Sequence, residues 1–433
     1  MTTSPLIQQA ATVDADLAAQ DAAWSKGFTR RRFIQGAGMV GAAALGTQLV
    51  TTRVAYAAPV AGQDPTTLNT VVTVFLRGGC DGLRVVVPGA SALGGDYLAQ
   101  VRPGLLPATS TVAPLSGGWA ANAGLAPLTP FWGSGELAFV PAVITDPSRS
   151  HSTTQRFLES GGTPNASTGW LDRLLTVLGP GTTFRAVGSG STPPNSLAGA
   201  EEKLAMNTLG DFKMPGWSGD LVATAMQSLY RGLDLPLTGK VNEAVAALGA
   251  ADTARAQATP ANGAVYPGNN SVANSLRDLA AMLKAEVGLQ VATVDVGGWD
   301  THTDEARDLD NNLLALSQCL AAFMTDLGPT RRSRVTVVVM SEFGRRVAQN
   351  GSGGSDHGLG GLMWLLGGGL ASSQVAGRWN PLSDAVLDQG DVPGLNSPFD
   401  VLGELATARL GAGSLSTVFP GGAAAPLGLF RRS

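Results

Sequence analysis

The chain has three histidines, and each lies beside a hydroxyl or carboxylate side chain. The pairs are Ser150 with His151, Asp300 with His302, and Asp356 with His357. Each histidine follows a predicted buried strand, and none falls within an apolar stripe. Imidazole and carboxylate groups together suit Zn²⁺ or Mn²⁺, and carboxylates also bind Mg²⁺ and Ca²⁺. The set therefore predicts a site for one or two divalent ions.

The elements that must position these groups are buried strands. Residues 334–341 are rich in β-branched side chains with no polar face, which predicts a strand of a parallel sheet that ends at Glu342. Glycines at 351–354 would let the chain fold back and bring Asp356 and His357 to the same edge. A charged strand end followed by a flexible loop is the alternative interpretation.

Three other apolar segments predict strands that end in polar residues. Residues 70–76 run into Asp81, which is flanked by glycines, and residues 290–296 run towards Asp300. Residues 136–144 lead into a segment with several hydroxyls and His151 at the predicted start of a helix, where capping alone would explain a single hydroxyl. The predicted metal ligands at these strand ends are Asp81, Asp300, His302, Glu342, Asp356 and His357.

Strands and helices alternate, which predicts an α/β fold with a mainly parallel sheet. Helices are expected at about 275–287, 305–327 and 399–410, and a further strand at 361–366. We expect residues 58–433 to form one domain, with residues 200–270 a helical insertion outside the sheet. Residues 89–133 are expected to be mostly loop, with Arg102 an ordinary surface arginine or an anion contact.

The N-terminus has the order of an export signal. After a polar stretch predicted to be disordered come Arg30-Arg31-Arg32-Phe33-Ile34, an uncharged Gly/Ala-rich run and Ala55-Tyr56-Ala57, which predicts a twin-arginine signal over residues 1–57. A membrane anchor is less favoured because the run is short and interrupted by polar residues. The expected location is periplasmic, cell-wall-associated or extracellular, with the twin-arginine translocase as export partner and membrane contact only through the leader.

Composition excludes some classes of protein. The net charge is −4 with 14% charged residues and no basic patch, which argues against nucleic-acid binding. Two cysteines are too few for a disulfide framework.

Five motifs resemble, in order, those of the bacterial domain-of-unknown-function 1501 family, over about residues 70–366. They are Arg77-Gly78-Gly79-Cys80-Asp81-Gly82, Arg149-Ser150-His151 with Gln155, Gly297-Gly298-Trp299-Asp300-Thr301-His302, Ser341-Glu342-Phe343-Gly344-Arg345 and Ser355-Asp356-His357-Gly358. That family is placed in the alkaline phosphatase and sulfatase superfamily, and its members often carry twin-arginine leaders.

The resemblance implies an alkaline-phosphatase-like three-layer α/β/α sandwich, with metal ions at the carboxyl ends of the strands and a Ser or Thr nucleophile at a helix start. Ser150 matches the nucleophile best, with Ser148 and Ser152 as rivals, and His151 would shuttle protons or support the site. Asp81 resembles the ligand of the first strand, and Asp300 with His302 the Asp-then-His pair.

Two departures leave two functions open. Phe343 stands where relatives have a histidine, and only one residue separates Asp300 from His302. The first function is an exported metal-dependent hydrolase of phosphate, or less favourably sulfate, esters, acting on a small-molecule or polymer-bound ester. The second is a non-catalytic secreted binding or assembly protein that keeps the fold and a structural metal.

Overall fold

The computed structural model describes residues 64–108, 113–212, 228, 236–422 and 425–431. The predicted export signal, residues 1–57, lies outside these ranges. Within them we find no helix with the length and apolarity needed to span a bilayer.

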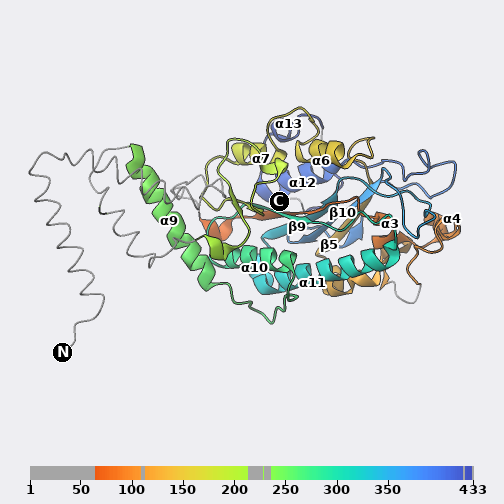
Figure 1. The fold of residues 1–433 in the computed structure, drawn as a ribbon, viewed down its shortest axis with the longest axis horizontal. Helices are drawn as coiled ribbons and strands as arrows, with labels where there is room; N and C mark the ends of the chain where they lie inside the picture. The colour runs from red at the N-terminus through yellow and green to blue at the C-terminus, as the bar shows by residue number, and fades with distance from the viewer. Residues whose placement is uncertain (1–63, 109–112, 213–227, 229–235, 423–424, 432–433) are drawn as a thin grey trace, which may run out of the picture. The chain divides into compact units, whose positions relative to one another are not determined.

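An eight-stranded sheet forms the centre of the fold, in the order β11-β5-β10-β9-β1-β8-β6-β7 (Figure 1). Its strands are β1 (Thr70–Leu76), β5 (Leu137–Val143), β6 (Ala186–Ser189), β7 (Leu204–Met206), β8 (Val291–Val296), β9 (Val335–Ser341), β10 (Gly361–Gly367) and β11 (Gln374–Val375). Only β10 runs antiparallel to its neighbours, β5 and β9. The prediction of an α/β fold with a mainly parallel sheet is confirmed.

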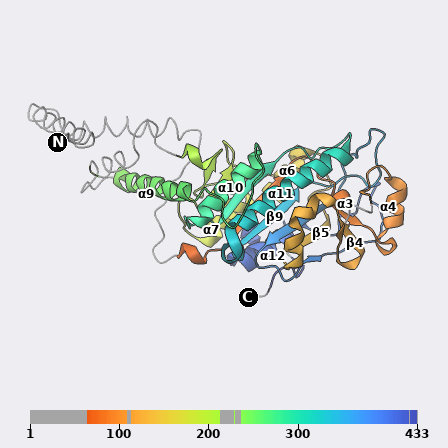
Figure 2. The ribbon, with the colours of Figure 1, turned by 90° about the horizontal axis from the view of Figure 1, so that it is seen from below.

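Helices cover both faces of this sheet. The helices of the described residues are α3 (Gly82–Val85), α4 (Gly95–Val101), α5 (Thr129–Gly133), α6 (His151–Glu159), α7 (Trp170–Leu178), α9 (Pro236–Ala256), α10 (Ser271–Lys284), α11 (Glu305–Arg332), α12 (Pro398–Leu410) and α13 (Leu415–Val418), of which six form the two layers. Figure 1 shows α6, α7, α12 and α13 on one face and α10 and α11 on the other, and Figure 2 shows the second face, with α10 and α11 towards the viewer. The predicted three-layer α/β/α sandwich is therefore confirmed.

The buried strands explain why two helical layers are needed. Every residue of β1 is buried, and because side chains alternate along a strand, Val71 and Phe75 pack into the core formed with α7 and α12. Val72 and Val74 then point to the other face, where they are also wholly buried. A strand with two apolar faces can be stable only between two layers.

Several predicted boundaries match the structure and two regions differ from it. The long helix α11 continues beyond the predicted end at residue 327, across a kink at Gly328 and Pro329. The expectation that residues 200–270 lie outside the sheet is wrong for β7, which forms one edge of it. Residues 89–133, expected to be mostly loop, include α4, α5 and two strands of a second sheet formed by β2 (Val86–Pro88), β4 (Trp119–Ala121) and β3 (Ala113–Pro114).

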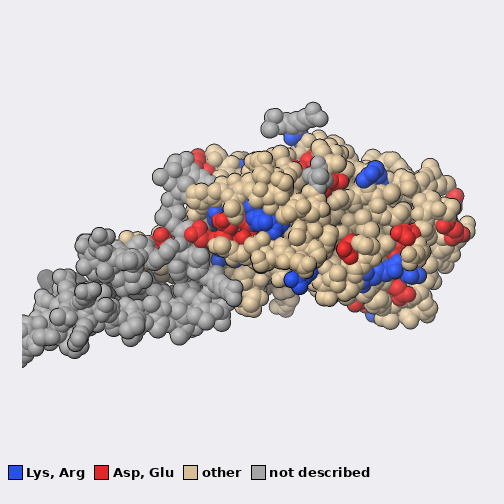
Figure 3. Space-filling model, turned by 90° about the horizontal axis from the view of Figure 1, so that it is seen from above, with Lys and Arg blue, Asp and Glu red and all other residues tan. Residues whose placement is uncertain are grey.

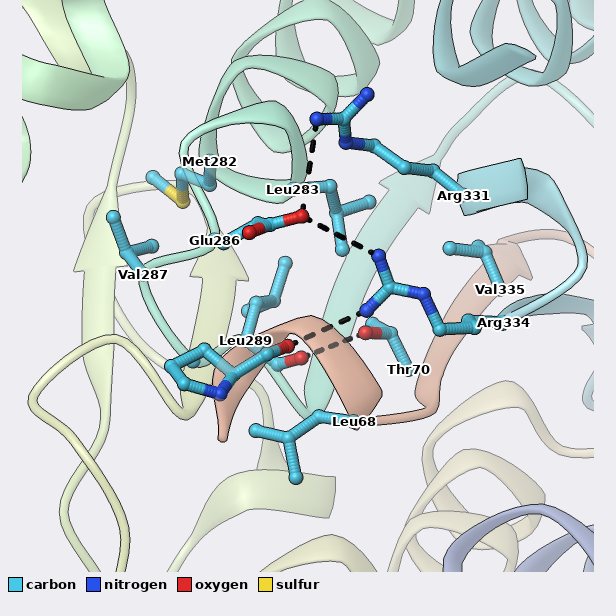
Figure 4. A pocket seen from close by; sticks show the side chains of 12 residues that line it. Leu68, Thr70, Met282, Leu283, Glu286, Val287, Leu289, Arg331, Arg334 and Val335 are labelled. Atoms are coloured by element: carbon cyan, nitrogen blue, oxygen red, sulfur yellow. Dashed lines mark hydrogen bonds and ion pairs between the residues drawn. The ribbon is translucent and has the colours of Figure 1, made fainter. Parts of the chain in front are cut away.

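The amino-terminal and carboxyl-terminal ends of the parallel strands differ in the residues that surround them. At the amino-terminal ends of β1, β8 and β9, a cavity of about 20 Å³ lies beside Glu286, Arg331 and Arg334, and it has room for a single water (Figure 4). The predicted site residues follow the carboxyl-terminal ends of the strands.

On the face of the molecule seen in Figure 3, basic and acidic side chains are intermixed, and most of the surface is formed by uncharged residues.

Candidate metal centre

The loops that follow β1, β5, β8 and β9 meet at one end of the main sheet, where the antiparallel strand β10 begins. The loop after β9 pairs with the segment before β10, with Gly344 N donating to Leu359 O at 3.1 Å and Gly358 N to Gly344 O at 2.9 Å. A Cβ at residue 358 would lie 2.4 Å from the backbone of Arg345, so only glycine allows this approach. This pairing places His357 beside the end of β9.

Three side chains meet in a group that could hold a metal ion: His151, Asp300 and His357, whose ligand atoms all lie within 4.8 Å of one another. The Nε2 of His357 is 3.0 Å from Asp300 Oδ1, and the Nε2 of His151 is 3.5 Å from Asp300 Oδ2. A fourth group joins them, since His302 Nε2 lies 3.0 Å from His357 Nε2 and 3.1 Å from Asp300 Oδ1.

These spacings fit a bound ion. Bonds of about 2.0–2.2 Å at tetrahedral angles separate the ligand atoms around Zn²⁺ by roughly 3.3–3.6 Å. A cation among these ligand atoms would offset the repulsion between their lone pairs. We therefore find a possible metal site made of His151, His357 and Asp300, with the imidazole of His302 beside it.

The outer nitrogens of two histidines are fixed by hydrogen bonds. His151 Nδ1 lies 2.8 Å from Glu342 Oε1, and His357 Nδ1 lies 3.0 Å from the carbonyl oxygen of Arg149. Both oxygens are acceptors, so each Nδ1 carries a proton and donates it away from the group, while each Nε2 faces Asp300. Metal-binding histidines in proteins are usually held in this way.

Glu342 lies in this outer layer. It is wholly buried, and its Oε1 also accepts hydrogen bonds from Gly78 N at 2.9 Å and Gln155 Nε2 at 2.8 Å. Burial alone would raise the pKa of Glu342, but the hydrogen bonds from His151 and Gln155 lower it. Its carboxylate is thus ionised and committed to orienting His151.

Asp300 is held by a buried cation. Arg345 Nη2 lies 2.6 Å from Asp300 Oδ1, and the Arg345 side chain is wholly buried. Partial burial opposes ionisation of Asp300, but hydrogen bonds from His357 and Arg345 and the charge of Arg345 lower its pKa to about 2. Asp300 is therefore ionised at neutral pH.

The structure does not bring Asp81, predicted as a ligand from the first strand, into this group. Asp81 is wholly buried, forms the N-cap of α3, and pairs through Oδ2 with Arg102 Nη1 at 2.7 Å. The buried partner Arg102 lowers the pKa of Asp81 against the effect of burial. The expectation that Arg102 is a surface arginine is wrong, because its side chain is 0% exposed.

The other predicted residues lie around the four-residue group. Asp356 is exposed, with Oδ1 3.5 Å from His302 Nδ1, so it contacts the group through that imidazole. Ser150 is the N-cap residue of α6, yet its hydroxyl makes no capping hydrogen bond and lies 3.3 Å from Ser152 Oγ. Ser150 is exposed, and its contact with Ser152 is the one side-chain hydrogen bond of its hydroxyl among the described residues.

No role was assigned from the sequence to Arg345, Gln155 or the carbonyl group of Arg149, although all three residues belong to the motifs quoted above. The signal that could have indicated Arg345 is an arginine four residues beyond the end of the buried strand β9. A cation there must find acceptors from several loops.

One buried carboxyl beneath the site predicts a pH effect on stability. Burial and the negative charge of Asp81 raise the pKa of Glu305 from 4.5 to about 8. Between these values the unfolded chain releases the proton and the folded chain keeps it, so the contribution of Glu305 to stability falls as pH rises from about 4.5 to 8 and is constant above.

We expect Glu305→Gln, which mimics the protonated acid, to gain stability relative to the native protein by roughly 1 kcal/mol or more between pH 5 and pH 8. Urea unfolding of both proteins at pH 5, 6.5 and 8 measures this difference. Both proteins keep the same histidines, so the pH dependence of metal binding cancels. A difference independent of pH would show that Glu305 titrates normally.

The comparison with protein families identifies the chain. The model of a family described as "Protein of unknown function (DUF1501)" matches residues 142–409, more than half of the sequence. The chain belongs to the DUF1501 family. The match begins in β5 and ends in α12, so it spans the three residues of the possible metal site and the adjacent His302. A comparison with curated proteins found no match for this DUF1501 protein.

Solved structures with a similar arrangement include two bacterial proteins. The C-terminal periplasmic domain of EptC from Escherichia coli, in complex with Zn, is 11% identical, with 72% of this chain and 76% of that chain covered and a TM-score of 0.30. The lipoteichoic acid synthase LtaP from Listeria monocytogenes is 10% identical, with 85% and 78% covered and a TM-score of 0.34. Similarity at this level is confined to the general arrangement of strands and helices.

Proposed function

We propose that this DUF1501 protein is an exported, metal-dependent hydrolase of phosphate esters. The observation that carries the proposal is the meeting of His151, His357 and Asp300, with His302 beside them, next to the Ser150 hydroxyl, which does not cap the helix that it begins. The leader predicted over residues 1–57 supports export by the twin-arginine pathway to the periplasm, cell wall or medium.

The residues of the chain have distinct roles in this proposal. The three histidines and Asp300 would hold one divalent ion, of which Zn²⁺ suits the ligand set best. When bound, such an ion stabilises the charge that develops on an ester oxygen. Ser150 Oγ would attack the phosphorus, aided by the helix N-terminus, which favours an anionic substrate there. Its proton passes to solvent, and the P–O bond to the alcohol breaks and releases the alcohol. Water then attacks the phosphoseryl group, which releases phosphate and restores the serine. Glu342 and the Arg149 carbonyl keep the imidazoles in the required orientation.

The test combines metal analysis with turnover. We expect the purified protein to contain about one divalent ion per chain and to hydrolyse phosphate esters in preference to sulfate esters. Ser150→Ala should reduce turnover at least about 10³-fold while metal content stays unchanged, because the hydroxyl is the nucleophile and not a ligand.

Ser152→Ala is the matched control, since Ser152 lies 3.3 Å away in the same helix turn. A comparable loss in Ser152→Ala with normal turnover in Ser150→Ala would assign the nucleophile to Ser152. The hydrolase proposal would be abandoned if the metal-loaded protein turned over no phosphate or sulfate ester.

One observation favours the second candidate, a binding or assembly protein with a structural metal. The ring of Phe343 is buried, and its centroid lies 4.9 Å from that of His151 and 4.7 Å from that of His357. An apolar ring there leaves no room for a second set of ligands on that side and supports one ion rather than two. A protein of this kind would be stabilised by metal and show no turnover in the same assays.

A further inference from the structure

Two arginines beside the metal centre share one buried carboxylate. Arg149 donates from Nε at 2.8 Å and also from Nη2 to Asp391 Oδ2, and Arg346 Nε lies 3.8 Å from Asp391 Oδ1. Asp391 is wholly buried, whereas the arginine side chains are 31% and 41% exposed. We call Arg149 and Arg346 the arginine pair.

Both members of the arginine pair are tied to the metal centre through the backbone. The Arg149 carbonyl accepts the hydrogen bond of His357 Nδ1, so one imidazole ring separates it from the group of ligands. Arg346 N donates to the carbonyl of Asp356 at 2.9 Å. Arg149 also directly precedes Ser150, the proposed nucleophile.

Arg149 alone is sufficient to form an ion pair with Asp391, so Arg346 is not needed for that pair. Arg149 alone satisfies Asp391 Oδ2, while Asp391 Oδ1 is buried without a hydrogen bond and Arg346 remains beyond bonding distance from it. Among the described residues, no side-chain hydrogen bond is made by Arg346. Two guanidinium groups thus lie against one buried carboxylate, and Asp388, another carboxylate near Asp391, is exposed.

We propose that the arginine pair is a subsite for a second anionic group of the substrate. This inference rests on the proposed function: the reacting phosphate lies at the metal centre, and a carboxylate or phosphate on the alcohol part lies against Arg149 and Arg346. Guanidinium groups with free donors bind such oxyanions in a planar, often bidentate manner. The substrate class is then phosphate esters whose alcohol part carries its own negative charge.

A pair of non-hydrolysable probes tests this directly. We would titrate the metal-loaded protein calorimetrically with 4-carboxyphenylphosphonate and with 4-carbamoylphenylphosphonate, which differ in one negative charge at nearly equal size. We expect about a tenfold preference for the carboxylate, as one charge-assisted contact gives. In Arg346→Gln the preference should fall to within about twofold, and Arg346→Lys should be intermediate.

Arg331→Gln is the matched control. Arg331 is 39% exposed and lies 3.8 Å from Glu286, nearly the same exposure and ion-pair distance as Arg346, but at the opposite edge of the sheet (Figure 4). It should keep the tenfold preference. Because Arg346 makes no side-chain hydrogen bond among the described residues, its substitution should leave the thermal unfolding temperature close to that of the native protein.

The outcomes separate this inference from the proposed function. Equal binding of the two probes, no binding of either, or a preference retained in Arg346→Gln would each overturn the subsite. A preference that depends on Arg346 in a protein without turnover would uphold the subsite and reject the hydrolase. Turnover of phosphate esters without a charge preference would do the reverse.

Discussion

Asp300→Asn is expected to abolish stoichiometric metal binding. Asp300 is the only carboxylate of the group His151, Asp300 and His357, and its pKa of about 2 means that it supplies a full negative charge to the ion. An amide offers a neutral oxygen and leaves the charge of Arg345 uncompensated. Outer-layer partners of metal ligands typically contribute 10–100-fold to affinity, so loss of this ligand should cost more than about 100-fold.

Competition with a chromophoric chelator, combined with elemental analysis, measures the affinity. Asp295→Asn serves as the control, since Asp295 lies on β8 with a similar exposed fraction, 44% against 47%, but pairs with Arg77 away from the group. We expect its affinity to equal that of the native protein. Native affinity in Asp300→Asn would show that the ion, if bound, lies elsewhere.

The strand ends could be predicted from the sequence because burial on two faces leaves a strong local signal. The segment 70–76 was predicted with the bounds of β1, and the strand before Glu342 matches β9 closely. Since parallel strands deliver their carboxyl ends to one edge, the meeting of Asp300, His302 and His357 also followed. These inferences needed only local pattern and one rule of topology.

The partners of each charged group could not be predicted in the same way. Asp81 resembled a ligand because glycines flank it, yet Arg102, 21 positions along the chain, takes its carboxylate. The carboxylate of Glu342 likewise forms hydrogen bonds with Gly78 and His151, which belong to two other segments of the chain. Which acceptor or donor lies nearest to a charged group depends on the paths of the loops and on the direction in which α6 starts. The hydrophobic periodicity of the sequence gives no information about either.

Arg345 explains how the loops hold together, and its replacement should have the largest effect on stability. Its guanidinium donates to the carbonyls of Gly78 at 2.5 Å, Gly79 at 2.6 Å, Ser355 at 2.9 Å and Trp299 at 3.1 Å, and to Asp300. The loop at Gly78 also needs glycine, because a Cβ there would lie 2.4 Å from Asp300 N. One side chain thus joins the loops after β1, β8 and β9.

Arg345→Met should lower the free energy of unfolding by on the order of 3–5 kcal/mol, because it leaves buried carbonyls without donors and Asp300 without its partner. Arg345→Lys should lose less, since an ammonium can satisfy up to three of these acceptors. Urea unfolding measures the stability, and chelator competition the metal affinity, which should fall in both variants.

Arg185→Met distinguishes loss of the site from general destabilisation. Arg185 is as buried as Arg345, with 1% of its side chain exposed, and it donates to the carbonyl of Leu175 at 2.8 Å, between α7 and β6. We expect it to destabilise the protein while the folded fraction keeps native metal affinity. If Arg345→Met lost stability but bound metal as tightly as Arg185→Met, the guanidinium would support the fold without positioning Asp300, and the metal centre would depend on its histidines for its geometry.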